Sequence, residues 1–230
     1  MVRRYVHGGG EEDPCVILDN LAPIIASNPR LPRIIHQQWK TEVLPPEYAR
    51  WRDGIYAAFP EHEYVLWTDS MMEELIYGDY PDFLDVYSSL PHPIMRVDAA
   101  RYFILHKHGG LYVDMDYEVL ANFWDRLPDD VPAIIQSFSH HLERTQNSLM
   151  SSPPKHELWP IAWDVIVRRT LTGSRDPIYV TGPRMLDEAI RIYHHRHHHH
   201  HHIATSSSYP PPRPPPRIGS GSSPARTGNA

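Results

Sequence analysis

Two aspartates separated by one residue follow a short apolar run in GGLYVDMDYE, residues 109–118. Asp114 and Asp116 come where the strand formed by LYV is expected to end. Two carboxylates this close repel each other unless a hard cation or a hydroxyl-rich ligand lies between them. Oxygen ligands of this kind favour Mg²⁺ or Mn²⁺ over zinc. By spacing alone the motif is a weak signal, and a solvated pair of loop carboxylates is the alternative interpretation.

A second pair of charged residues comes just before this motif, in PIMRVDAARYFILHKH (residues 93–108). This segment is expected to form a helix that the following Gly-Gly pair ends. Asp98 and Arg101 are three residues apart, so they share one helix face. Alone they would be an intrahelical ion pair of little energetic weight. Because the helix ends in the turn that presents Asp114, we expect these polar groups to gather and to bind a diphosphate with its attached sugar.

The elements that position these residues alternate between strands and helices. Strands are expected at 33–39, 63–69, 111–113 and 131–138, and helices at 46–59, 71–76, 80–89, 93–108, 154–171 and 183–193. This alternation predicts an α/β fold with a mostly parallel sheet and helices on both faces. Ligands of such sheets bind at the carboxyl ends of the strands, where Asp114 and Asp116 are expected to lie.

Composition divides the chain into three parts. Residues 1–30 are expected to be a loosely ordered lead-in, residues 31–193 the folded domain, and residues 194–230 a low-complexity tail of His, Pro, Arg and Ser. The tail is expected to be disordered, because it has too few apolar groups to offset chain ordering. Its histidine run, 197–202, is interpreted as a low-complexity or tag-like segment rather than as a set of metal ligands.

Charge and cysteine usage exclude several classes of function. The tail holds four Arg and no acidic residue, so the formal net charge of −6 becomes −10 for residues 1–193. A domain this acidic is a poor partner for nucleic acid. The single cysteine, Cys15, excludes a disulfide framework and a four-cysteine zinc site. No apolar run reaches the ~18 residues of a membrane span. The N-terminal residues lack the apolar region of a signal peptide.

The block PIMRVDAARYFILHKHGGLYVDMD resembles the signature of glycosyltransferase family 32, which places R-x-D-x-x-R-Y before G-G-x-Y-x-D-x-D. PRIIHQQWK and EYVLWTD resemble the first two strands of that family. QNSLMSSPPKHELW is similar to a segment that closes over the sugar donor, and TGPRML to a later Gly-Pro turn. Within the family, the sequence resembles the fungal-type mannosyltransferases that act on inositol phosphorylceramide. The resemblance implies a GT-A-like, Rossmann-type domain over residues 31–193.

The resemblance also implies a role for each matching residue. Asp116 would bind Mn²⁺ (or Mg²⁺) that bridges the donor diphosphate, and Asp114 would contact the metal shell and the donor hydroxyls, so these two are the expected catalytic residues. Asp98 would accept hydrogen bonds from the donor sugar, while Arg101 would orient sugar and phosphate. Trp39 matches a position that stacks on the nucleotide base; a core or rim tryptophan is the alternative.

Two further positions match with less defined roles. Asn147 corresponds to a polar donor-site residue. His36 belongs to the motif, where supporting the strand is one interpretation. The glycines of the Gly-Gly pair, 109–110, are expected to shape the backbone rather than to do chemistry.

The implied activity is metal-dependent, retaining transfer of a hexose, at Golgi membranes or in the Golgi lumen. GDP-mannose is favoured as donor over a UDP-sugar, and the acceptor would be lipid-linked or a glycan, such as inositol phosphorylceramide. Family members continue past the Gly-Pro turn, where this sequence has its tail, so the domain is expected to be truncated, divergent at its end or impaired in catalysis. A nucleotide-sugar-binding protein without turnover is therefore the alternative. The oligomeric state is left open.

Two other enzyme classes use paired carboxylates. Phosphatases of the haloacid dehalogenase type need Thr or Val two residues after the second aspartate, where this chain has Glu118. They also need a distant lysine before a paired acid, whereas the pair at 129–130 comes too soon. Glycosidases need carboxylates about 5 Å or more apart on opposite sides of the substrate. Adjacent carboxylates at one strand end fit a shared cation better.

Overall fold

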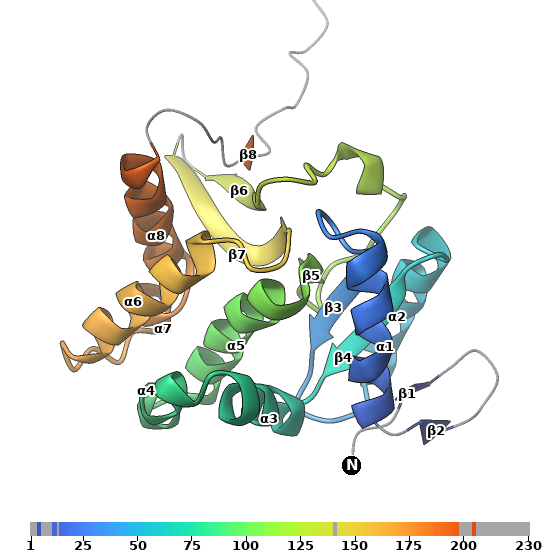
Figure 1. The fold of residues 1–230 in the computed structure, drawn as a ribbon, viewed down its shortest axis with the longest axis horizontal. Coiled ribbons are helices and arrows are strands. Elements are labelled where there is room, and N and C mark those ends of the chain that lie inside the picture. The colour runs from blue at the N-terminus through green and yellow to red at the C-terminus, as the bar shows by residue number, and fades with distance from the viewer. Residues whose placement is uncertain (1–3, 6–10, 13, 140–141, 198–203, 206–230) are drawn as a thin grey trace, which may run out of the picture.

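The computed structural model describes residues 4–5, 11–12, 14–139, 142–197 and 204–205, with side chains for residues 21–137 and 145–197. Its centre is a six-stranded sheet in the order β4-β3-β5-β7-β6-β8 (Figure 1). The strands are β3 (Ile34–Gln38), β4 (Glu63–Trp67), β5 (Gly110–Val113), β6 (Ala133–Ser139), β7 (Leu142–Ser152) and β8 (Ala204–Thr205). A separate antiparallel pair is formed by β1 (Arg4–Tyr5) and β2 (Glu11–Glu12).

The sheet is mixed, because β7 runs opposite to the other five strands, which share one direction; the expected mostly parallel sheet therefore contains one antiparallel strand. β3 pairs in parallel with β4 and β5, and β6 with β8, whereas β7 is antiparallel to both β5 and β6. β7 is not among the strands expected from the sequence. Because antiparallel strands need only a short connection, β6 and β7 follow each other directly in the chain, and β7 returns beside β5.

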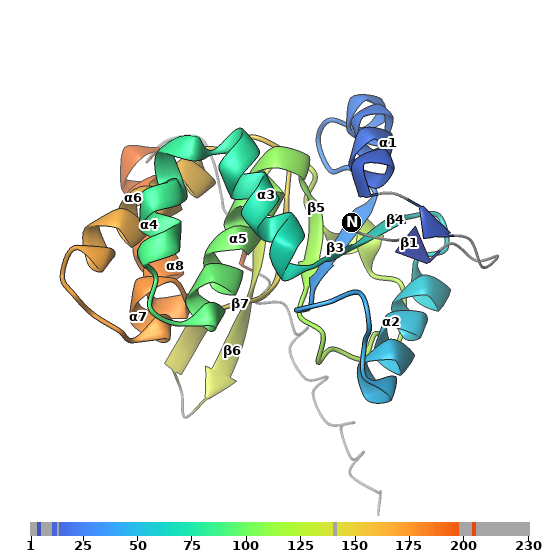
Figure 2. The same ribbon diagram turned by 90° about the horizontal axis from the view of Figure 1, so that it is seen from below.

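Helices cover both faces of the sheet, as expected, with α2 on one face and α3, α5, α6 and α8 on the other (Figure 2). The α-helices are α1 (Pro14–Ser27), α2 (Pro46–Ala58), α3 (Asp69–Asp79), α4 (Leu84–Ser89), α5 (Pro93–His108), α6 (Leu158–Thr170), α7 (Pro177–Val180) and α8 (Pro183–Arg196). Two short 3₁₀ helices are η1 (Pro81–Phe83) and η2 (Trp124–Arg126).

Successive side chains of the central strands enter two separate cores. Ile34 and Tyr112 pack with the helices α3, α5, α6 and α8, whereas Ile35, Leu111 and Val113 pack with α2 and η2. Side chains alternate between the faces of a strand, so strands buried on both faces read as continuous apolar runs. This double burial fixes the position of β3 and β5, and therefore of the residues that follow them.

Both ends of the domain extend beyond the expected bounds. Within the expected lead-in, the structure has α1, whose Leu21 is buried in the larger core. Pro23 inside this helix interrupts the apolar pattern, which hid the helix from sequence reasoning. At the other end α8 continues to Arg196. Residues 198–203 and 206–230 lie outside the described residues, so the disordered tail and the tag-like histidine run stay predictions.

Within the described part of the chain, no helix is both long and apolar enough to cross a bilayer.

The turn between α5 and β5 depends on two glycines. Gly109 and Gly110 have φ of 65° and 88°, a region that other residues rarely adopt. A Cβ on Gly110 would lie 2.5 Å from the carbonyl oxygen of Ile34. The missing side chain thus lets β5 lie against β3 directly after the helix ends.

Replacing Gly110 with Ala is expected to destabilise the protein by about 2–4 kcal/mol, since left-handed backbone strain adds to a backbone clash. Gly78, in α3, is the matched control, because a Cβ there meets nothing within 4 Å. Gly78→Ala should leave stability unchanged or raise it by up to about 1 kcal/mol. Urea denaturation measures both variants. Equal stabilities would mean that the Gly110 turn does not hold β5 in place.

Candidate functional site

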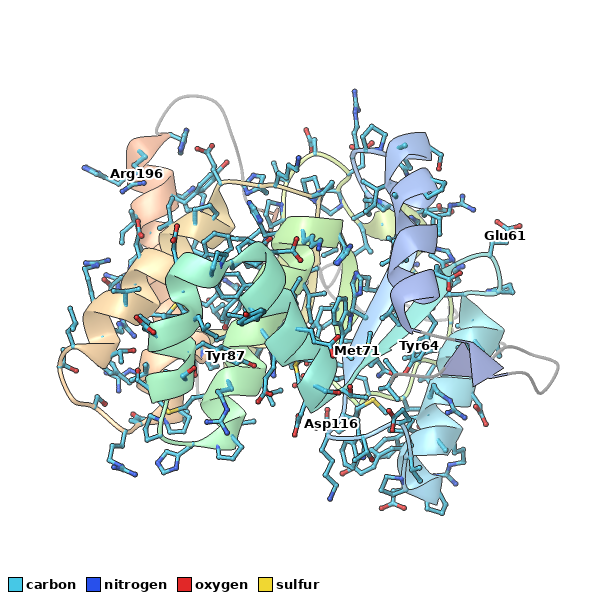
Figure 3. All side chains as sticks on the ribbon, turned by 60° about the horizontal axis from the view of Figure 1, so that its bottom comes forward. Glu61, Tyr64, Met71, Tyr87, Asp116 and Arg196 are labelled. Carbon is cyan, nitrogen blue, oxygen red and sulfur yellow. The ribbon has the colours of Figure 1, made fainter. Side chains whose placement is uncertain are left out.

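The carboxyl ends of β3, β4 and β5 meet at one edge of the sheet, because these strands run parallel. Asp114 follows β5 at this edge, and its carbonyl oxygen accepts a hydrogen bond from Gln37 Nε2 at 3.2 Å. Asp116 lies two residues further on, close to the beginning of α3 (Figure 3). The position that the sequence predicts for the aspartate pair, at a strand end, is therefore observed.

Arg101 connects the helix pair to the aspartate motif. Its Nη2 lies 2.9 Å from Asp98 Oδ1, and its Nη1 lies 3.2 Å from Asp114 Oδ1. Nη1 also donates to the backbone carbonyl of Asn147 at 2.7 Å. Arg101 is only 3% exposed. Arg101 is thus a buried cation between the carboxylates of Asp98 and Asp114. The Asp98–Arg101 contact is not the weak surface ion pair of the alternative interpretation.

Two side chains hold the Asp98 carboxylate in addition to Arg101. Its Oδ1 accepts from Asn147 Nδ2 of β7 at 3.1 Å, and its Oδ2 accepts from Thr181 Oγ1 at 3.4 Å. Asn147 also donates to the hydroxyl of Tyr102 at 3.1 Å, and that hydroxyl donates to the Thr181 carbonyl at 2.7 Å. Asp98, Arg101, Asp114 and Asn147, which the sequence predicts separately, therefore form one hydrogen-bonded network.

The two oxygens of the Asp114 carboxylate differ in their surroundings. Oδ1 lies 3.2 Å from Arg101 and 2.5 Å from the Tyr112 hydroxyl, which lies 2.8 Å from Gln38 Oε1. Oδ2 has no hydrogen bond to a described residue, and the side chain is 30% exposed. One oxygen is therefore fixed by the protein while the other is available to a ligand.

Asp116 is exposed and forms no hydrogen bond or ion pair within the described part of the chain. No group of three or more His, Cys, Asp or Glu side chains that could hold a metal occurs among the described residues. A divalent cation at Asp116 and Asp114 would therefore take its other ligands from a bound molecule and water. This is how Mg²⁺ is commonly held beside phosphates, by one or two carboxylates, so the two aspartates fit such an ion.

Burial shapes the charges of the network. It raises the pKa of Asp98, although Arg101 opposes the shift, and it raises the pKa of Asp114 against Arg101 and the Tyr112 hydrogen bond. The charge of Asp116 raises the pKa of Asp114 further. Burial also lowers the pKa of Arg101, but Tyr112 and the two aspartates raise it by more. The network thus holds one permanent cation between carboxylates that a further positive charge would keep ionised.

Trp39 directly follows β3 at the same edge but belongs to a different group of side chains. Its ring centroid lies 4.7 Å from that of Tyr48 in α2, and its indole Nε1 is buried without a described hydrogen-bond partner. Within the described residues, its contacts do not include the Arg101 network. The half-buried ring is compatible with either interpretation, so base stacking stays a prediction.

His36 supports the backbone and does not face the network. Its Nδ1 accepts from Trp67 Nε1 at 3.0 Å, so its Nε2 carries the proton and donates to the Gly109 carbonyl at 2.9 Å. Burial lowers the pKa of His36 to about 4. Both ring nitrogens are occupied, which is the strand-supporting role that the sequence analysis left open.

Sequence reasoning missed four members of the network: Gln38, Tyr102, Tyr112 and Thr181. Tyr112 and Tyr102 lie within the quoted signature, Gln38 lies within PRIIHQQWK, and Thr181 begins the TGPRML segment, so the resemblance held a signal for all four. The segment around Asn147, which the resemblance describes as closing over the donor, is instead strand β7. Asn147 is buried there, because β7 lies in the middle of the sheet.

Comparison with known proteins identifies relatives of this chain. A family model described as "Glycosyltransferase sugar-binding region containing DXD motif" matches residues 48–136. "Inositol phosphoceramide mannosyltransferase 3" of Schizosaccharomyces pombe is 49% identical over 86 residues, which are 37% of this chain and 24% of the relative. "Mannosyl phosphorylinositol ceramide synthase SUR1" of Saccharomyces cerevisiae is 34% identical over 182 residues, 72% of this chain and 45% of the relative. The chain spans less than half the length of these two relatives.

Among solved structures, "PaToxG Glycosyltransferase" matches with a TM-score of 0.54 and 13% identity, covering 78% of this chain and 76% of that one. This likeness bears on the fold alone and shows the α/β fold of a GT-A-type glycosyltransferase. The DXD motif of the matching family implies dependence on a divalent metal and a nucleotide-sugar donor. The matched residues include α5, β5 and the aspartate motif, so this chain belongs to the glycosyltransferase family whose sugar-binding region contains the DXD motif.

Proposed function

We propose that the chain is a metal-dependent, retaining glycosyltransferase that moves mannose from GDP-mannose to a lipid-linked or glycan acceptor such as inositol phosphorylceramide. The observation that carries this proposal is the Arg101 bridge between Asp98 and Asp114, next to the exposed Asp116. The named relatives support mannose as the sugar and a phosphorylated inositol lipid as the acceptor. Such an acceptor would place the reaction at Golgi membranes or in the Golgi lumen.

Asp114 and Asp116 would bind the donor through a shared metal ion. Asp116 and the free Oδ2 of Asp114 would hold Mn²⁺ (or Mg²⁺) and leave its remaining positions to the donor diphosphate. When bound, the ion would neutralise charge on the departing diphosphate, a contribution of several kcal/mol. The exposed position of Asp116 suits this role, because the carboxylate needs no rearrangement to reach a ligand.

Arg101 and Asp98 would position and bind the donor without contacting the metal ion. Both Nη atoms of Arg101 are engaged by the protein, so we assign it to positioning the two carboxylates rather than to direct contact with phosphate. Asp98, fixed by Arg101, Asn147 and Thr181, would accept hydrogen bonds from hydroxyls of the donor sugar. Preorganised groups of this kind need no reorganisation during the reaction.

Retention follows from front-face transfer in this proposal. The bond between the anomeric carbon and the diphosphate oxygen breaks with the electron pair leaving on the diphosphate. The acceptor oxygen forms its bond to the same face of that carbon and gives its proton to the departing phosphate. Asp98 and Asp114 are both held by Arg101, which disfavours either as a covalent nucleophile.

Thermal unfolding with nucleotide sugars tests the proposal. GDP-mannose at about 100 times its Kd should stabilise the protein by about 2.7 kcal/mol and raise Tm by about 5–10 °C, with Mn²⁺ present and not with EDTA. UDP-glucose is the competing donor. Release of GDP on addition of acceptor would separate an enzyme from a binding protein without turnover. If no nucleotide sugar shifts Tm in either condition, the chain is not a donor-binding protein.

A further inference from the structure

A groove lies between α3, α4 and α5, outside the Arg101 network. It encloses about 520 Å³, within the range of about 300–1,000 Å³ that is usual for small-molecule sites. We call it the α3–α5 groove and define it by five lining residues: Glu73, Glu74, Tyr77, Tyr87 and Arg96. None of these residues has a role in the donor site described above.

Tyr87 supplies a hydroxyl that the described protein leaves without a partner. The residue is only 3% exposed, yet its hydroxyl forms no hydrogen bond within the described residues, and it lines the groove. Burial raises the pKa of Tyr87, so the group stays protonated and can donate. The hydroxyl oxygen is not among the fully buried unpaired polar atoms of the described residues, so it opens into the groove, where it can donate to a bound molecule. The hydroxyl at this position therefore favours a ligand with an acceptor oxygen.

The other groove residues define the chemistry of that ligand. Glu73 and Glu74 are exposed carboxylates without an ion pair to a described residue, and carboxylates accept hydrogen bonds from hydroxyls. Tyr77 is 72% exposed, so its ring face is open for packing against C–H groups. Arg96 is fixed by donating from Nη1 to the Leu90 carbonyl at 3.1 Å. Because the groove holds two carboxylates and one cation, its net negative charge disfavours a phosphate. A neutral ring that carries several hydroxyls fits this charge better.

The groove is connected to the catalytic edge by its helices. α3 begins directly after β4, at the edge that holds Asp114. Arg96 lies in the first turn of α5, two residues before Asp98. In Figure 3, Asp116 lies near the beginning of α3 and Tyr87 lies on the other side of that helix. A molecule held in the groove would thus lie next to the donor rather than in its place.

We propose that the α3–α5 groove binds the hydroxyl-rich ring of the acceptor, whether a lipid-linked inositol or a hexose of a glycan. The identification of the bound ring as the acceptor rests on the proposed function. The binding of a polyol ring to the groove does not depend on it. Tyr87 donates to a ring oxygen, Glu73 and Glu74 accept from ring hydroxyls, and Tyr77 covers one face of the ring.

Kinetics test the groove within the proposed reaction. Tyr87→Phe and Glu73→Gln should each raise the acceptor KM about fivefold, the effect of one lost hydrogen bond. The donor KM and the rate of donor hydrolysis without acceptor should be unchanged. Glu61→Gln is the control, since it removes an exposed carboxylate that pairs with Arg33 far from the groove, two residues before β4 (Figure 3). An acceptor KM equal to that of the wild type in both groove variants would overturn the proposal.

A binding measurement separates failure of the groove from failure of the proposed function. Saturation-transfer NMR on the full chain should detect myo-inositol or methyl α-mannoside, and the responding ligand identifies the lipid or the glycan source. The Tyr87→Phe/Glu73→Gln double variant should lose the signal while its Tm stays that of the wild type. Ring binding by a protein whose Tm does not respond to nucleotide sugars would contradict the proposed function but support the assignment of the groove. No ring binding by the wild type, or equal binding by the double variant, would remove the groove assignment whatever the donor results.

Discussion

Replacing Asp116 with Asn is expected to lower the rate of sugar transfer at least about a hundredfold, because loss of a metal ligand removes about 3 kcal/mol or more of stabilisation from the departing diphosphate. The fold should be unaffected. Asp116 is exposed and has no hydrogen bond in the described part of the chain, so its neutral isostere breaks no contact. Surface substitutions of this kind change stability by less than about 0.5 kcal/mol.

The measurement is release of GDP from GDP-mannose, with and without acceptor, over a range of Mn²⁺ concentrations. Glu118→Gln is the matched control, because Glu118 is an exposed carboxylate in the same loop but outside the motif. Only the Asp116 variant should require more Mn²⁺ or fail to respond to it. If Asp116→Asn kept the full Mn²⁺-dependent rate, the ion would bind elsewhere and the proposed donor site would be wrong.

Local patterns predicted the elements that carry the site. The apolar runs of β3, β4 and β5 and the proline at the start of α5 mark these elements within a few residues of their observed bounds. The patterns of β3 and β5 are strong because their residues are buried on both sides, as Ile34 and Ile35 show in β3. The site residues at their ends follow from the topology, since parallel strands bring their carboxyl ends to one edge.

The elements that were missed lack such patterns. β7 reads LERTQNSLMSS, in which polar residues occupy the interior of a central strand. Thr145, Asn147, Ser151 and Ser152 are nevertheless buried, because the Arg101 network, Trp159 and neighbouring strands satisfy part of their hydrogen bonding. No local propensity indicates a strand here. This segment forms a strand because of hydrogen-bond partners that lie far away in the chain, and a single sequence does not show these partners.

The network shows the same limit for side chains. Asp98 and Arg101 share a helix face by spacing, so their contact was predictable. Gln38 reaches the Tyr112 hydroxyl, which lies beside Asp114, only because β3 and β5 are neighbours in the sheet. Thr181 reaches Asp98 from 83 residues away. Spacing thus predicts contacts within one element, whereas contacts between elements required the fold.

Arg101 is the group on which this network depends, and this gives a second large expected effect. Arg101→Met is expected to destabilise the protein by about 3–5 kcal/mol, the usual cost of leaving a buried charge without its partner. Asp98 and Asp114 would lose their shared cation, and their raised pKa values show that burial already disfavours their charged forms. Arg50→Met, at an exposed position in α2, is the matched control and should change stability by less than about 0.5 kcal/mol.

A double-mutant cycle separates this charge effect from the loss of packing. Asp98→Asn removes one of the two carboxylates, so Arg101→Met should cost at least about 1 kcal/mol less in that background than in the wild type. Urea denaturation of the four proteins at pH 7 gives the coupling energy. Asp114 would remain without a cation in the double variant, so the rescue should be partial. Additive effects would mean that Arg101 holds its place by packing alone, and its role in positioning Asp98 and Asp114 for the donor would have to be given up.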